Sequence, residues 1–154
     1  MVMRVYVDTS VIGGCLDEEF REWSCRLMAE CHSGQKHAIL SELTLRELAD
    51  APATVREVVE ALPPEHREIL RANAEVLALA DAYLRAGVVT QHSLADAQHI
   101  AFATVARVDV LVSWNFRHIV NLNRIRLYNS VNLRLGYGLI DIRTPREVLD
   151  EEDS

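Results

Sequence analysis

Apolar residues along this chain recur with two different periods, and segments of the two kinds alternate. Four short runs are rich in β-branched and aliphatic residues, which predicts buried strands. These runs span residues 4–8, 37–40, 108–113 and 139–142. Elsewhere apolar residues recur every three or four positions, which predicts helices. The helical segments are residues 17–31, 44–50, 65–86 and 124–135, a short helix between Pro52 and Pro63, and a helix that begins at Ser93.

Two of the helical segments carry detailed expectations. In residues 65–86, the longest periodic segment, apolar side chains form one continuous stripe that ends at Gly87, so we expect a single helix there. That helix would also offer a surface for a partner or for a homodimer. The helix that begins at Ser93 opens with Ser-Leu-Ala-Asp, which matches a capping box with Asp96 at the third helical position.

The alternation of strands and helices defines the expected fold class. It implies an α/β protein, a three-layer α/β/α sandwich with a mostly parallel central sheet. A chain of 154 residues fits one domain, which we place at residues 1–148, followed by an acidic tail at residues 149–154 that we expect to be flexible. In such sheets the functional residues lie at the carboxyl ends of the strands.

Composition narrows the class of protein further. The first ten residues lack the basic and apolar regions of a signal peptide, and charges interrupt every apolar stretch long enough to cross a membrane. We therefore expect a cytoplasmic protein without membrane contact. Cys15, Cys25 and Cys31 are odd in number and are not paired in C-x-x-C motifs, so we interpret them as buried free thiols.

Charge is spread unevenly along the chain. The net charge of −7 argues against a polyanionic partner such as nucleic acid. Residues 104–146, however, hold seven arginines and two aspartates, a charge of +5, so the remaining residues carry −12. The arginines either form a phosphate-binding surface or are separate solvated residues that never meet in space. The sequence leaves both possibilities open.

Four polar residues stand at or near the predicted carboxyl ends of strands: Asp8, Glu47, Asp96 and Asn115. Three carboxylates and an amide, with hydroxyl groups from Thr9, Ser10 and Ser113 beside them, are hard oxygen donors of the kind that Mg²⁺ or Mn²⁺ binds. Two carboxylates about 5 Å apart repel each other by about 3 kcal/mol at an effective dielectric near 20, so a convergent set needs a proton or a cation. We take Asp8, Glu47 and Asp96 as the candidate metal ligands.

Each acid also has an ordinary explanation. Asp8 could belong to a turn or cap a helix, and Glu47 could be a solvated helix residue. Asp96 could do no more than complete its capping box. The common placement of these acids at one predicted edge of the sheet is what favours a shared site.

The spaced motifs around these acids resemble the PIN-domain ribonucleases, many of which are VapC-type toxins of toxin–antitoxin pairs. The motifs are V-D-T-S-V at residues 7–11, S-E-L-T-L-R-E-L at 41–48, L-A-D-A-Q-H-I-A at 94–101 and L-V-S-W-N-F at 111–116. The resemblance implies a PIN-like parallel sheet, a Mg²⁺ or Mn²⁺ cofactor, endonucleolytic cleavage of RNA and an antitoxin partner. It places the catalytic acids at Asp8, Glu47 and Asp96, with Glu42 as a competitor for Glu47.

One position departs from the family pattern. PIN domains usually carry an aspartate after the later strand, in a T-x-D pattern, whereas this chain has Ser113-Trp114-Asn115. Asn115 removes a negative charge from the site, so the chain is either an active ribonuclease or a weak or inactive PIN-fold module that binds RNA or a protein. A haloacid-dehalogenase-like phosphatase is disfavoured because Ser10 stands where its second aspartate belongs.

Several further side chains are candidates for contact with RNA. Arg117, Arg124 and Arg126, with Arg134, could bind phosphates without specifying sequence. Trp114 and Tyr137 could stack on bases, although packing within the protein is the simpler interpretation. His99 and His118 lie close to the acids in sequence, and each is also consistent with an ordinary helix or loop histidine.

Overall fold

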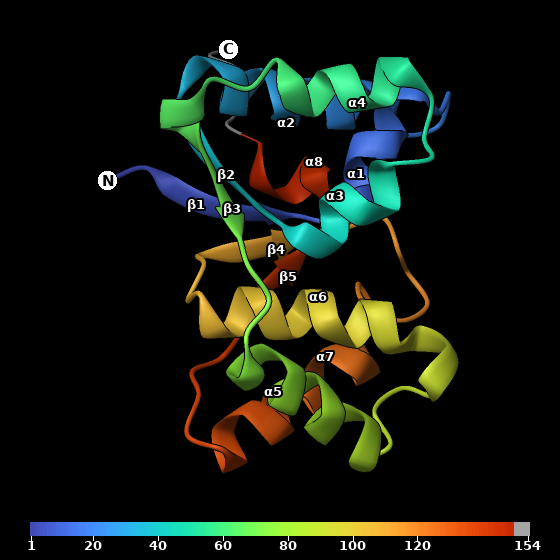
Figure 1. Ribbon diagram of the computed structural model, residues 1–154, viewed down its shortest axis with the longest axis vertical. Helices are drawn as coiled ribbons and strands as arrows, with labels where there is room; N and C mark the ends of the chain where they lie inside the picture. Colours follow the sequence, from blue (N-terminus) through green and yellow to red (C-terminus); the bar gives the residue numbers. More distant parts are fainter. Residues whose placement is uncertain (150–154) are drawn as a thin grey trace.

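The computed structural model describes residues 1–149 and contains a five-stranded parallel sheet at its centre (Figure 1). The strand order is β3-β2-β1-β4-β5, and every neighbouring pair is parallel. The strands are β1 (Met3–Val7), β2 (Lys36–Ser41), β3 (Arg67–Leu70), β4 (Val110–Val112) and β5 (Ile142–Arg143). Because all strands run in one direction, their carboxyl ends lie along a single edge of the sheet.

The first strand lies in the middle of the sheet, between β2 and β4. Val5 is paired with Ala38 on one side and with Val110 on the other. Val5, Tyr6 and Val7 are all completely buried, because side chains that alternate between the faces of this sheet meet helices on both sides. This explains why the strand is a continuous apolar run rather than an alternating one.

Helices cover both faces of the sheet and give three layers (Figure 1). One face packs against α5 (Ala74–Arg85), α6 (Leu94–Val105) and α7 (Leu122–Arg134), with Tyr6 and Ile39 in that core. The other face packs against α2 (Arg21–Ser33) and α4 (Ala53–Glu60), with Val5 and Leu40 in that core. The short helices on this second side are α1 (Thr9–Gly13), α3 (Glu42–Leu48) and α8 (Pro145–Val148). The chain also contains three 3₁₀ turns within the described residues: η1 (Gly14–Leu16), η2 (Pro64–His66) and η3 (Gln91–Ser93).

The prediction of one helix over residues 65–86 is wrong. Residues 64–66 form η2, residues 67–70 form the edge strand β3, and α5 begins only at Ala74. The strand pairs with β2, where Leu40 lies opposite Ile69. Asn73 starts the helix, since its side-chain oxygen accepts a hydrogen bond from the Val76 N–H at 2.8 Å. Pairing with β2, a contact distant in sequence, therefore overrides the local helical period.

The prediction of a capping box at Ser93 is also wrong. Ser93 does precede α6, but its side chain makes no cap hydrogen bond. Its backbone N–H donates to the Thr90 carbonyl at 2.9 Å instead of to Asp96. The Asp96 carboxylate is therefore not used as a cap.

Other sequence predictions need smaller adjustments. The helix predicted at residues 44–50 begins at Glu42, because Ser41 and Thr44 form a capping box. The last strand is Ile142–Arg143 rather than 139–142. Cys15 and Cys31 are buried free thiols, as expected, and burial raises the pKa of each to about 12, whereas Cys25 is exposed.

At the carboxyl end, Leu149 packs partly buried against the core that contains Val5. The expected acidic tail at residues 149–154 otherwise lies outside the described residues. Within residues 1–149 no helix combines the length and the apolar character needed to cross a bilayer.

Candidate acidic site

Asp8 lies directly after β1, at the carboxyl edge of the sheet, and is 5% exposed. Its backbone N–H donates to the Val112 carbonyl of the neighbouring strand at 3.1 Å, which fixes its position. Its Oδ2 accepts hydrogen bonds from Ser10 Oγ at 2.6 Å and from Ser113 Oγ at 2.8 Å. The side chain makes no cap hydrogen bond to α1. Asp8 is therefore a carboxylate held by two hydroxyl groups and not a helix cap.

Glu47 reaches the same edge from α3, and a buried histidine connects it to Asp8. Glu47 Oε1 accepts a hydrogen bond from Thr9 Oγ1 at 2.9 Å and lies 2.5 Å from His99 Nε2. The same imidazole nitrogen is 3.5 Å from Asp8 Oδ1. His99 is 1% exposed, so this contact lies beneath the surface between the two acids. The interpretation of His99 as an ordinary helix histidine is therefore wrong.

The charges of this group stabilise one another. Burial opposes the charged form of His99, but its hydrogen bond to Glu47 and the nearby Asp8 carboxylate raise the pKa of the imidazole above its usual value. Burial likewise opposes ionisation of Glu47, yet the hydrogen bond and the positive charge of His99 lower the pKa of this carboxyl overall. Both shifts favour an imidazolium between two carboxylates.

A chain of buried hydroxyl groups holds the other side of the imidazole. His99 Nδ1 is 2.7 Å from Tyr6 Oη, and Tyr6 Oη is 2.8 Å from Ser41 Oγ. Burial raises the pKa of Tyr6 above its usual value, so the phenol keeps its proton. An imidazolium donates to Tyr6, which then donates to Ser41. This chain fixes the ring plane and thereby the position of Glu47.

Asp96, in the first turn of α6, is connected to the loop after β4 by Asn115. Asn115 Nδ2 donates to Asp96 Oδ1 at 3.2 Å, while its Oδ1 accepts from the N–H groups of Arg117 and His118 at 3.1 and 3.0 Å. Burial, and then the negative charge of Asp8, raise the pKa of Asp96 above its usual value. The amide therefore has a structural role in the loop and places a hydrogen-bond donor beside an acid.

His118 is the second histidine near these acids. His118 is one of the groups that lower the pKa of Asp96, although burial raises this pKa by more. Its Nδ1 is the single buried side-chain nitrogen or oxygen without a hydrogen-bond partner within residues 1–149. Its backbone N–H donates to Asn115 Oδ1, so the conformation of the loop positions the His118 residue.

The fit of these acids to a cation depends on which of their oxygens are free of hydrogen bonds. Within residues 1–149 no group of three or more histidine, cysteine, aspartate or glutamate side chains is arranged so that it could hold a metal ion by itself. One oxygen of each candidate ligand nevertheless accepts no hydrogen bond from any described residue; these are Asp8 Oδ1, Glu47 Oε2 and Asp96 Oδ2. Mg²⁺ keeps several waters and binds through few carboxylates, so this donor set fits a hard divalent cation.

The arginines predicted to contact RNA have different surroundings. Arg117 and Arg126 are exposed. Arg124 is partly buried, and its guanidinium donates to the Val88 carbonyl at 2.6 Å. Arg124 therefore stabilises the loop before α6, and the two exposed arginines are the freer candidates for phosphate contact.

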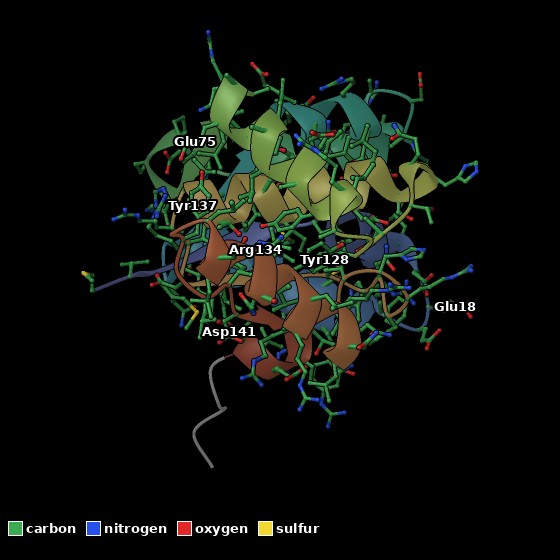
Figure 2. The ribbon with its side chains drawn as sticks, turned by 90° about the horizontal axis from the view of Figure 1, so that it is seen from below. Glu18, Glu75, Tyr128, Arg134, Tyr137 and Asp141 are labelled. Atoms are coloured by element: carbon green, nitrogen blue, oxygen red, sulfur yellow. The ribbon has the colours of Figure 1, made fainter. Side chains whose placement is uncertain are left out.

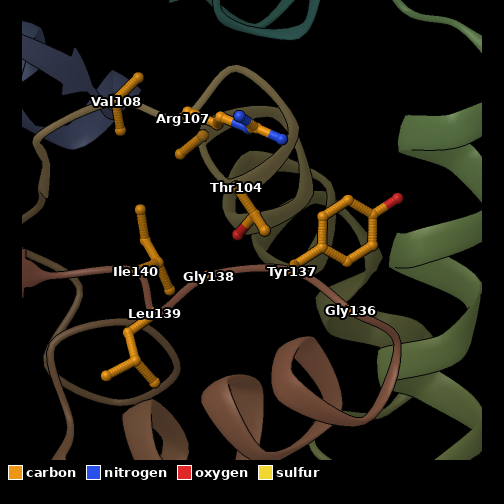
Figure 3. A pocket seen from close by; sticks show the side chains of 9 residues that line it. Thr104, Arg107, Val108, Gly136, Tyr137, Gly138, Leu139 and Ile140 are labelled. Atoms are coloured by element: carbon orange, nitrogen blue, oxygen red, sulfur yellow. The ribbon is translucent and has the colours of Figure 1, made fainter.

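Tyr137 does not lie near the acids. Its hydroxyl donates to Glu75 at 2.8 Å, and Figure 2 shows this pair on the opposite side of the molecule from Glu18. Tyr137 also lines a cavity of about 330 Å³ between the end of α6 and residues 136–140 (Figure 3). Val108, which precedes β4, lines the same cavity, so it lies at the amino-terminal edge of the sheet. The described residues that line it include no carboxylate.

Aromatic residues gather beside the acidic site. Phe20 and Trp114 are stacked, with ring centroids 4.3 Å apart, and Phe116 is tilted against both. Trp114 is packed within the protein, as its simpler interpretation predicted, whereas the side chain of Phe116 is 52% exposed. Sequence reasoning overlooked Phe20 and Phe116, since only their position relative to Asn115 distinguishes them from core residues.

Comparison with known proteins supports the architecture. No protein-family model matches the chain, and no curated protein sequence matches it. Among solved structures, the chain is similar to a chain in the crystal structure of VapBC2 from Rickettsia felis. In that structure VapBC2 is bound to a DNA fragment from its own promoter. The two share 12% sequence identity over 92% of this chain and 98% of that one, with a TM-score of 0.56. This likeness establishes the fold, and the expectation of a PIN-like three-layer α/β sandwich is confirmed.

Proposed function

We propose that this chain is a metal-dependent endoribonuclease that cleaves RNA phosphodiesters with Mg²⁺ or Mn²⁺. The observation that supports the proposal most directly is the placement of Asp8, Glu47 and Asp96 at the carboxyl edge of a PIN-like sheet, each with one oxygen free of hydrogen bonds. Ligand sites in open parallel sheets lie at this edge. An acidic group with free oxygens at that place suits a divalent cation better than a structural role.

Hydroxyl and imidazole groups next to Asp8 and Glu47 would hold these two acids in position for the reaction. Ser10 and Ser113 donate to Asp8 Oδ2 and leave Oδ1 without a hydrogen bond, 3.5 Å from His99 Nε2. Thr9 and His99 hold Glu47 Oε1 in the same way. A bound Mg²⁺ or Mn²⁺ would supply an activated water and stabilise the charge that develops on the phosphate. The hydroxyl and imidazole contacts keep the acids in place before the cation binds.

We propose further that the chain acts with protein partners. The solved relative is a VapBC complex, which supports an antitoxin as partner and a homodimer as the assembled state. On this proposal the chain is the toxin of a toxin–antitoxin pair in the cytoplasm. Co-expression with the protein encoded by a neighbouring gene, followed by size-exclusion chromatography, tests both the complex and the dimer.

A second candidate function is supported by Asn115. Its amide places an N–H donor beside Asp96, where a carboxylate would instead add a ligand for a cation. A site with fewer ligands holds a metal less tightly, so a PIN-fold module that binds RNA or a protein without cleaving it is the competing proposal.

Cleavage of RNA by the purified chain tests the first proposal. With Mn²⁺ or Mg²⁺ present, we expect cleavage of labelled RNA that stops on addition of EDTA and falls by at least about 100-fold in Asp8→Asn, since this change removes a ligand charge. Asp50→Asn is the matched control, because Asp50 is an exposed acid outside the site. Equal cleavage by Asp8→Asn and the wild type would refute the proposal. RNA binding without cleavage in either metal would favour the second candidate.

A further inference from the structure

The stacked aromatic pair beside the acidic site is held rigidly. Trp114 Nε1 donates to Ser24 Oγ at 2.8 Å, and the Phe20 ring lies 16° from parallel to the indole. Gly14 allows this close packing, since a Cβ there would lie 2.5 Å from Ser24 Oγ and 3.0 Å from Trp114 Nε1. The pair therefore forms a fixed base for whatever packs on it.

Phe116 extends this base to the surface. Its ring centroid is 6.3 Å from that of Trp114 and 6.4 Å from that of Phe20, at tilts of 53° and 45°. The side chain is nevertheless 52% exposed. A half-exposed aromatic ring that contacts a fixed aromatic pair offers an apolar surface on which a nucleobase can stack.

The position of Phe116 ties this surface to the acids. Asn115, its neighbour in the chain, donates to Asp96, and adjacent Cα atoms are about 3.8 Å apart. The loop that carries Phe116 therefore also contacts Asp96. This shared loop is the connection between the aromatic cluster and the acids.

Exposed charges of opposite sign lie next in sequence to Phe116 and to Phe20. Arg117 is exposed directly after Phe116, whereas Asp17, Glu18 and Glu19 are exposed directly before Phe20. A phosphate is attracted by Arg117 and repelled by the three acids. A single strand can direct its phosphates to one side and unstack a base, whereas a duplex carries phosphates on both sides and buries its base faces.

We propose that Phe116, supported by Phe20 and Trp114, is a stacking platform for a base next to the scissile phosphodiester of single-stranded RNA. This proposal rests on the proposed ribonuclease function, which it makes more specific. It assigns the chain an unpaired RNA segment as substrate and Phe116 as a residue that contacts it.

The test measures stacking without cleavage. A short single-stranded RNA that contains 2-aminopurine is titrated with full-length protein in EDTA, and loss of 2-aminopurine fluorescence reports stacking on a ring. We expect the wild type to quench the probe, Phe116→Tyr to retain quenching, and Phe116→Leu to lose it with about 5- to 150-fold weaker binding. Leu139→Ala, at an exposed leucine in the loop after α7, is the control and should bind as the wild type does.

The outcomes separate this proposal from the proposed function. Equal quenching by Phe116→Leu and the wild type, or no binding of the probe, would overturn the platform. Cleavage without quenching would leave the ribonuclease standing and remove the platform. Quenching without cleavage in Mn²⁺ would refute the ribonuclease, and only the stacking of a base on Phe116 would remain. Equal binding of a duplex of the same sequence would overturn the assignment to single strands.

Discussion

At the scale of single residues, the most informative side chain is His99. Two carboxylates close together in a protein need a compensating positive charge. His99 supplies one, because its Nε2 lies between Glu47 and Asp8 while Tyr6 holds its other nitrogen. The metal-free protein therefore tolerates the two acids without a bound cation.

The stability of the metal-free protein should depend on pH through this pair. The pKa of His99 is raised in the folded protein, so its contribution is complete below about pH 6.5 and is lost as pH rises through the raised value. The pKa of Glu47 is lowered, so its contribution is complete above about pH 4.5 and is lost as pH falls through the lowered value. Stability from the pair is greatest between these limits.

Urea unfolding in EDTA across pH 5 to 9 measures this dependence. We expect the wild-type free energy of unfolding to decrease above about pH 6.5, by at most about 1.4 kcal/mol per pH unit for one proton. In His99→Gln this decrease should be absent, because glutamine binds no proton. An unchanged pH profile in His99→Gln would show that another group is responsible.

Asn115 gives the second prediction at this scale. In Asn115→Asp one carboxylate oxygen can still accept hydrogen bonds from the Arg117 and His118 N–H groups. The other oxygen takes the place of Nδ2, so the hydrogen bond to Asp96 is lost and two carboxylates face each other. We expect the metal-free protein to lose about 1–3 kcal/mol and the affinity for Mn²⁺ to increase. Thermal unfolding with and without Mn²⁺ measures both effects. If Mn²⁺ stabilises the variant no more than the wild type, Asn115 does not face the cation site.

At the scale of secondary-structure elements, the beginnings of α5 and α6 show how local patterns mislead. Residues 65–86 have a helical period throughout, but the first part pairs with β2 and the helix starts at Asn73. Ser93 has the sequence of a capping box but makes no cap hydrogen bond, because η3 precedes α6 and leaves Ser93 in a non-extended conformation with ψ near 25°.

Matched cap substitutions test this difference. Asn73→Ala should reduce the free energy of unfolding by about 1 kcal/mol, because it removes the acceptor for the Val76 N–H. Ser93→Ala should change it by less than about 0.5 kcal/mol, since no cap hydrogen bond is lost. Chemical denaturation of both variants at one pH measures the two effects. A larger loss in Ser93→Ala than in Asn73→Ala would contradict this assignment of caps.

At the scale of the whole molecule, the arginines of residues 104–146 do not form one basic surface. Arg143 contacts Asp141 and Glu147, and Arg146 lies over the Trp23 ring at 4.6 Å. The Arg124 guanidinium donates a hydrogen bond to the Val88 carbonyl. Only part of the positive charge in this segment is therefore available to RNA, in a chain whose net charge is −7.

Binding to RNA should accordingly have a weak dependence on salt. If Arg117 and Arg126 each contact one phosphate, the logarithm of affinity for a single strand should fall with a slope of about 1.4 against the logarithm of salt concentration. Arg117→Gln should lower that slope by about 0.7, and Arg85→Gln, at an arginine paired with Asp81, should not change it. Fluorescence anisotropy at several salt concentrations measures these slopes. A slope several times steeper would reveal a larger basic surface.

Local patterns in the sequence were enough to predict the parallel α/β architecture and the place of Asp8, because both follow from the period of apolar residues. Strands β1, β2 and β4 are apolar runs whose ends can be read directly. Asp8 follows β1 and Asp96 lies in the first turn of α6, whereas Glu47 lies in the last turn of α3. The same local period failed at β3, where an edge strand gains its hydrogen bonds from β2.

The contacts that hold the site together arise from tertiary packing. His99 and Glu47 are 52 residues apart in the chain, and Ser113 and Asp8 are 105 apart, so no pattern in sequence connects them. The exposure of Phe116 likewise depends on how Phe20 and Trp114 pack beneath it. Contacts between distant residues and the fraction of a side chain left open to solvent arise from packing, which the period of apolar residues does not specify.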